Sequence, residues 1–209
     1  MNKANAITTM EQLEALYDAV NPVALLKELD HISPEYARFI EASPFLILAT
    51  SGPEGLDCSP RGDPAGFTRV IDSKTAAIPD RRGNNRVDSL RNIVRDPRVA
   101  LLFMVPGVGE TMRINGRARI SVEPDLCASF AMDGKQPKCV ILVTAERVYP
   151  QCQKALHRSR LWDPSRHMAR SALPSVGQMM QAVAASKNER FYGAAYDASY
   201  PQRLKDTIY

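Results

Sequence analysis

The sequence predicts a mainly β protein, a six-stranded antiparallel barrel with helices at its periphery. About six short apolar runs fall within residues 45–150, and turn residues separate them. Few helical patterns interrupt these runs, which favours antiparallel strands over a doubly wound parallel sheet. The segments before and after this stretch have helical or irregular patterns.

Three helical segments with capping signals precede the strands. A Ser, Thr or Asn just before an apolar periodic run is a helix start signal, and a proline at the first helical position strengthens it. The predicted starts are Thr8 or Thr9 before "MEQLEALYDAV", Asn21-Pro22 before "VALLKEL", and Ser33-Pro34 before "EYARFIEAS".

The predicted strands follow in two groups. The first group is "FLILATS", "LDCSP", "FTRVID" and "KTAAIPD", with a Gly-Pro-Glu-Gly turn after the first run. The second group is "RVALLFMVPG", "ETMRINGRARISV" and "CVILVTAERVYP". Asn115-Gly116 makes the middle run of this group a strand pair or one bent strand. Pro124 starts a short helix, and "LPSVGQMMQAVAAS" is the clearest helix of the remaining chain.

These patterns divide the chain into three parts. We expect an N-terminal helical extension over 1–43, a barrel domain over 44–164, and a C-terminal helical tail over 165–209 that packs on the same domain.

Composition narrows the class of protein. The chain has 209 residues, 44% hydrophobic and 24% charged, which is typical of a folded globular protein. Acidic residues occur in the first twenty and no apolar run is long enough to span a bilayer, so we expect a cytoplasmic protein without a signal peptide or membrane partner. The four cysteines form no Cys-x-x-Cys pair, which predicts reduced, mostly buried thiols and no metal site.

The stretch "PDRRGNNRVDSLRNI" predicts an anion site. Val87, Leu90 and Val94 have helical spacing, and Asn85 is a suitable N-cap with Asp88 three residues later. A helix N-terminus carries partial positive charge and free N–H groups, so arginines around it favour a bound phosphate. Those arginines are Arg81, Arg82 and Arg86.

Surface ion pairs are the alternative interpretation of these arginines. Asp63, Asp80 and Asp88 could neutralise them, and such pairs contribute only about 0–1 kcal/mol. The residues alone leave both interpretations open. Nucleic-acid binding has less support, because the net charge is only +4 and the basic residues form no long run.

Four stretches carry a resemblance to a known family. In chain order they are "ATSGPEGLDCSPRGDPAGF", "PDRRGNNRVDSLRNI", "VALLFMVPGVGETMRINGRARI" and "KALHRSRLWDP". Together they resemble the pyridoxamine 5′-phosphate oxidase-like, FMN-binding split β-barrel family, and within it a bacterial branch of uncharacterised flavoproteins. The resemblance covers residues 45–164.

The resemblance implies a homodimer that binds two FMN molecules at the subunit interface. The segment implied to approach the flavin is Ser59, Pro60, Arg61, Gly62 and Asp63. The implied phosphate-binding residues are Arg81, Arg82, Asn84, Asn85 and Arg86, and the implied strand pair is Thr111 and Arg113. Trp162 is implied to reach the ring system across the dimer. FAD or a deazaflavin remains an alternative ligand to FMN.

The implied activity is an FMN-dependent oxidoreductase that acts on a small-molecule substrate. No catalytic residue is assigned, because the flavin itself carries the redox chemistry. A non-catalytic flavin-binding or flavin-sensing protein is the alternative.

Two departures from the oxidases proper make pyridoxamine 5′-phosphate a poor expected substrate. Thr111 stands where those enzymes tend to have Gln. The chain also lacks their Trp…Arg-Leu ending, since Arg203-Leu204 lies far from Trp162.

Overall fold

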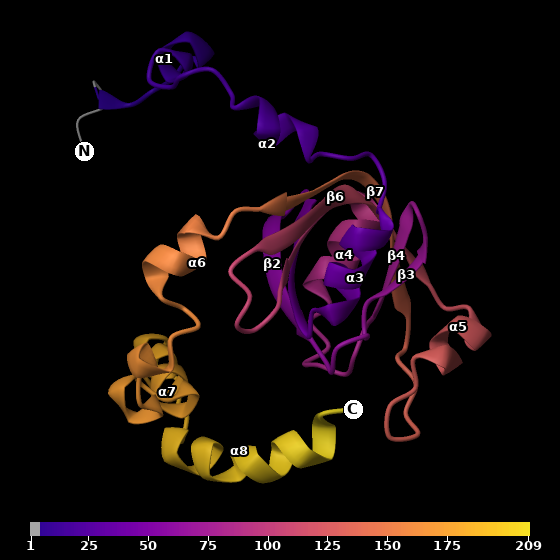
Figure 1. The fold of residues 1–209 in the computed structure, drawn as a ribbon. Helices are drawn as coiled ribbons and strands as arrows, with labels where there is room; N and C mark the ends of the chain where they lie inside the picture. The colour runs from indigo at the N-terminus through magenta and orange to yellow at the C-terminus, as the bar shows by residue number, and fades with distance from the viewer. Residues whose placement is uncertain (1–4) are drawn as a thin grey trace.

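A computed structural model describes residues 5–209, in which seven antiparallel strands form one sheet with helices at its periphery (Figure 1). The strands are β1 (Phe45–Gly52), β2 (Gly55–Gly62), β3 (Arg69–Asp72), β4 (Thr75–Pro79), β5 (Arg98–Met104), β6 (Thr111–Ser121) and β7 (Val140–Gln151). Their order is β2-β1-β5-β6-β7-β4-β3. The predicted antiparallel split barrel is confirmed, with seven strands instead of six. Each of the seven apolar runs of the sequence contains one of these strands, including β3 within "FTRVID", so the prediction of about six was one too low.

Alternating apolar positions on the central strands build the core. Leu46 and Leu48 of β1 pack with Leu101 and Phe103 of β5, and all four are at most 1% exposed. Strand β6 is one continuous strand that pairs with β5 on one side and β7 on the other. Its register with β7 shifts between Asn115 and Gly116, where β7 has one extra residue, Glu146.

The three predicted N-terminal helices are present. They are α1 (Met10–Glu14), α2 (Pro22–Leu26) and α3 (Pro34–Ala42). Thr9, Asn21 and Ser33 cap them, and each side-chain oxygen accepts a backbone N–H of the first turn. Only α3 contributes to the core, through Ile40. The first four residues of the predicted 1–43 extension lie outside the described residues.

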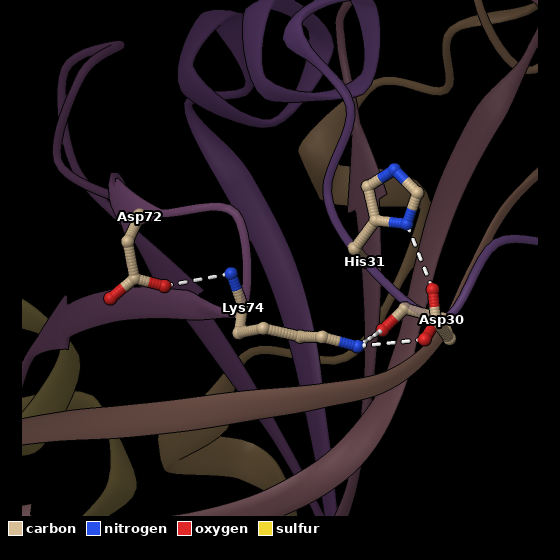
Figure 2. Close-up of polar contacts among 4 residues, drawn as sticks. All are labelled: Asp30, His31, Asp72 and Lys74. Carbon is tan, nitrogen blue, oxygen red and sulfur yellow. Dashed lines mark hydrogen bonds and ion pairs between the residues drawn. The ribbon is translucent and has the colours of Figure 1, made fainter.

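A polar contact fixes the start of α3 against the β3–β4 turn (Figure 2). Lys74 Nζ donates to Oδ2 of Asp30 at 3.0 Å and to the backbone oxygen of the same residue. His31 Nδ1 lies 2.8 Å from Oδ1 of Asp30, and Asp72 accepts the Lys74 backbone N–H at 2.7 Å. The His31 hydrogen bond and the Lys74 ammonium lower the pKa of Asp30 to about 2.

Helix α4 (Asp88–Arg95) begins later than predicted. Asn85 is not its N-cap, because Asn85 has φ of 60°, the helix starts after Val87 (φ 53°), and no side chain caps it. The predicted apolar stripe is also wrong at Val87 and Val94, which are both exposed. The buried face instead contains Ser89 and Asn92, whose side chains donate to Asp57 and Thr50. Polar partners supplied by β1 and β2 make this burial favourable, and no periodicity rule anticipates them.

The other helices lie along the second half of the chain. They are α5 (Pro124–Ser129), α6 (Lys154–Ser159), the 3₁₀ turns η2 (Pro164–Arg166) and η3 (Arg170–Ala172), α7 (Val176–Ser186) and α8 (Gly193–Thr207). The predicted helices at Pro124 and within 173–186 are confirmed. Ser175 and Gln178 form a capping box at the start of α7. Among the described residues, no helix has both the length and the apolar character needed to cross a membrane.

Candidate functional site

A large cleft lies beside the end of β2, the loop from β4 to α4 and the loop before β7. Its volume is about 1450 Å³, above the 300–1,000 Å³ of ordinary ligand pockets. Ten of the predicted site residues line it: Ser59, Pro60, Arg61, Gly62, Asp63, Arg81, Arg82, Asn84, Asn85 and Arg86. The fold therefore brings together two segments that the sequence separates by about twenty residues.

Arg61 has a buried donor atom without a hydrogen-bond partner, and it lines this cleft. Its Nη1 donates to Asp80 Oδ1, and both side chains are 17% exposed. Its Nε is buried and has no hydrogen-bond partner within the described residues. A buried N–H without a partner costs free energy, so this atom marks a place where a ligand acceptor would be favourable.

Arg81 is held by the protein itself. Its Nε donates to Oδ2 of Asp63 at 2.6 Å, and its Nη1 donates to the backbone oxygen of Phe130 at 2.6 Å. The Tyr209 hydroxyl donates to the other oxygen of Asp63 at 2.7 Å, and its ring centre lies 5.6 Å from the guanidinium. The hydrogen bond to Asp63 raises the pKa of Tyr209. Arg81 thus stabilises the cleft wall in this structure.

Arg82 and Arg86 are more accessible to a ligand. Arg86 pairs with Asp88 at 2.8 Å, with the Arg86 side chain 74% exposed, and its backbone N–H donates to Asn84 Oδ1 at 3.0 Å. Arg82 has no acidic partner in residues 5–209 and contacts only the backbone oxygen of Asp206, at 3.5 Å. Because α4 begins at Asp88, both arginines precede the helix, whereas an N-cap at Asn85 would have placed Arg86 in its first turn.

The structure contains features that fit each of the two interpretations of the arginine cluster. Asp63 and Asp88 pair with Arg81 and Arg86, as the ion-pair alternative proposes. Arg82 and the orphaned Nε of Arg61 leave donor capacity that these acids do not satisfy. The donor set of the cleft is therefore suited to an added anion.

Three predicted site residues lie elsewhere. Thr111 is buried at the start of β6, opposite Gln151. Arg113 Nη1 donates to the Tyr149 hydroxyl at 3.0 Å, and Arg113 lines a small hollow of about 230 Å³ on the sheet. Trp162 Nε1 donates to the backbone oxygen of Val108 at 2.8 Å. These three residues form a second group around the start of β6 and the loop before it.

Sequence reasoning missed several residues of the cleft wall. Lys135, Lys138 and Cys139 come from the loop before β7, and Tyr209 comes from the segment after α8. The basic "GKQPK" run after the Asp133-Gly134 turn could have indicated the loop. No local signal indicates Tyr209, which lies 146 residues from its partner Asp63.

The cysteines divide evenly between interior and surface. Cys127 and Cys139 are buried, whereas Cys58 and Cys152 are exposed, so the prediction of mostly buried thiols holds for only half of them. Burial, helped by the nearby Asp80 carboxylate, raises the pKa of Cys139 to about 11. Within residues 5–209, no group of His, Cys, Asp and Glu side chains is arranged to hold a metal ion.

Comparison with known proteins identifies one family model, described as pyridoxamine 5′-phosphate oxidase, which matches residues 32–152. The chain is similar in structure to HupZ of Group A Streptococcus, with a TM-score of 0.47 and 19% identity over 58% of this chain and 94% of that one. It is also similar to an FMN-binding protein of Syntrophomonas wolfei, with a TM-score of 0.43 and 9% identity over 68% and 95% of the two chains. A separate comparison with curated proteins finds no match.

Proposed function

Because the chain belongs to the pyridoxamine 5′-phosphate oxidase family, we propose that it is an FMN-binding flavoprotein and an oxidoreductase of a small molecule. One observation carries the proposal. The cleft gathers ten residues that family resemblance assigns to FMN, and it leaves a buried arginine N–H without a partner.

The cleft residues fit FMN by their chemistry. Arg82 and Arg86 offer charged donors to the phosphate at the accessible rim, and Arg61, whose Nε has no partner, lines the same cleft. Arg81 keeps the wall in place through Asp63 instead of serving as the main phosphate ligand. FMN, when bound, supplies the redox chemistry, and the protein binds and orients it.

The arrangement on one chain supports a homodimer with FMN at the interface. Thr111, Arg113 and Trp162 do not line the cleft, so a complete predicted site needs these residues from a second copy. The face of β1 and β5 that carries Ile47 and Leu102 is apolar and only half-buried, which suits a covered interface. We further propose the three-part division into 1–43, 44–164 and 165–209, and a cytoplasmic location.

Loss of Arg86 tests the phosphate assignment. A charge-assisted contact contributes about 1.5–3 kcal/mol, so Arg86→Ala weakens FMN binding about tenfold or more. The matched control is Arg95→Ala, in the last turn of α4, where an exposed arginine pairs with Glu54 away from the cleft. Equal FMN dissociation constants for the two variants would remove Arg86 from the site.

The identity of the ligand and the activity need separate measurements. The absorption spectrum of the purified protein, with mass identification of the released group, distinguishes FMN from FAD or a deazaflavin. Oxidation of reduced nicotinamide faster than by free FMN supports the oxidoreductase, and its absence with tight FMN binding supports the non-catalytic alternative. We expect kcat/KM for pyridoxamine 5′-phosphate below about 10⁴ M⁻¹s⁻¹.

The fluorescence of Trp162 tests whether the segment around it crosses the proposed dimer. It is the single tryptophan, so its emission is unambiguous. If Trp162 of one protomer lies beside the flavin bound mainly by its partner, FMN quenches its fluorescence. Unchanged emission at saturating FMN would show that the segment around Trp162 does not cross the dimer.

A further inference from the structure

Residues 5–26 form an arm that is apolar but buries none of its side chains. Neither α1 nor α2, both within the described residues, contains a buried residue. The large apolar side chains of the arm, from Ile7 to Leu26, are 38% to 81% exposed. Exposed apolar side chains gathered in one segment mark an interaction surface.

The exit of the arm from the barrel is fixed. The backbones of Leu29 and Val148 exchange two hydrogen bonds, of 2.9 and 2.7 Å. Arg147 makes a bidentate contact with Glu28, at 2.7 and 2.9 Å. These contacts direct the arm away from the barrel, and Figure 1 shows α1 and α2 apart from α6.

Residues 154–173 form a second exposed segment, which is basic. This segment follows β7 and includes α6, η2 and η3, and most of its residues are exposed. Its exposed large apolar residues are Leu161, Met168 and Leu173. Its basic residues are Lys154, Arg158, Arg160, Arg166 and Arg170, and its one acidic residue, Asp163, already pairs with Arg160.

The arm carries the complementary charge. Its charged residues are all acidic: Glu11, Glu14 and Asp18. Neither these acids nor Lys154, Arg158 and Arg166 take part in an ion pair within residues 5–209. Apolar surface with opposite charge on the two segments is what a specific contact requires.

We propose that the arm, residues 5–26, docks on residues 154–173 of a second copy of this chain, and that the exchange is reciprocal. A second copy is the occupant because the two segments lie apart within one chain and the anchored exit holds them so. A two-fold arrangement pairs each arm with the other chain's basic segment, so both contacts form together. The proposal rests on the homodimer of the proposed function, but flavin binding has no part in it.

A charge swap tests the proposal. The arm variant carries Glu14→Lys and Asp18→Lys, which leaves Glu11 to support the first turn of α1. The segment variant carries Lys154→Glu and Arg166→Glu, since Lys154 begins α6 and a glutamate suits that position. Neither variant touches a residue of the cleft. Hydrogen exchange of residues 10–26 and sedimentation are measured for each variant alone and for their equimolar mixture.

Each outcome has a distinct meaning. We expect arm amides of the wild type to gain protection, about tenfold or more, as protein concentration rises through the dimerisation range. We expect each variant alone to lose that protection and the mixture to regain it, because only the heterodimer restores opposite charges at both contacts. If the protection of the arm amides does not depend on protein concentration, the arm docks within one chain and the exchange is overturned. The same conclusion follows if mixing the two variants fails to restore the protection. A dimer with unprotected arms overturns the exchange alone, whereas a monomer at all concentrations overturns both the exchange and the proposed homodimer.

Discussion

Replacing Asp63 by asparagine, with Asp88→Asn for comparison, contrasts a buried arginine pair of the cleft with an exposed one. Asp63 is 2% exposed and Arg81 is 16% exposed, and Nε of Arg81 donates to the carboxylate at 2.6 Å. Asp63→Asn keeps the shape but removes the charge, so the guanidinium loses its counter-charge in a largely dry environment. In the exposed pair, Arg86 is 74% and Asp88 is 40% exposed, and water compensates the same loss.

The expected magnitudes differ severalfold. Breaking a buried pair costs 3–5 kcal/mol, and the residual exposure of Arg81 places Asp63→Asn near the lower end, at about 3 kcal/mol. The surface pair contributes about 0–1 kcal/mol, so Asp88→Asn changes stability by less than about 1 kcal/mol. For a chain of 209 residues, about 3 kcal/mol corresponds to a fall in Tm of roughly 7 °C.

Urea unfolding followed by circular dichroism measures both variants at the same pH and salt. An unchanged slope with a lower midpoint would attribute the effect to folded-state stability. If the two variants lose equal stability, the Asp63–Arg81 pair is not the buried support of the cleft wall. Raising the salt concentration provides a further control, since the buried pair is screened far less than the exposed one.

Three further predictions concern the barrel and its titrating groups. Gly116→Ala costs about 2 kcal/mol or more in urea unfolding, because the new Cβ would lie 2.0 Å from the backbone oxygen of Thr144, whereas Gly83→Ala, with open space around it, leaves stability unchanged. Cys139, whose pKa burial raises to about 11, reacts with iodoacetamide at pH 8 about tenfold or more slowly than the exposed Cys58 and Cys152, as mass spectrometry of labelled peptides can show. The pKa of Asp30 is lowered to about 2, so the stability that the Asp30 carboxylate contributes is present at a pH above its pKa in the unfolded chain and is lost as the pH falls through about 2. Lys74→Met moves the pKa of Asp30 toward its ordinary value, which an NMR titration of the carboxyl detects.

Local sequence determined the elements whose physical cause is local. Thr9, Asn21 and Ser33 cap their helices because a side-chain oxygen needs only the next turn's N–H groups. The runs of β1, β5 and β7 were recognisable because alternating or continuous apolar residues suffice to indicate a buried strand. The arginine stretch also predicts an anion site, because its charges and turn residues lie within fifteen positions, and that site stays a prediction.

Tertiary structure alone decided which groups of the cleft remain free. Asp63 engages Arg81 from 18 residues away and Tyr209 reaches Asp63 across 146, and no periodicity encodes contacts at such separations. Helix α4 begins at Asp88, and not directly after Asn85 as predicted, because buried partners on β1 and β2 position the helix instead of the capping residues. Whether an arginine is a buried support or an accessible donor depends on which distant acid and how much water surround it, and only the folded chain specifies both.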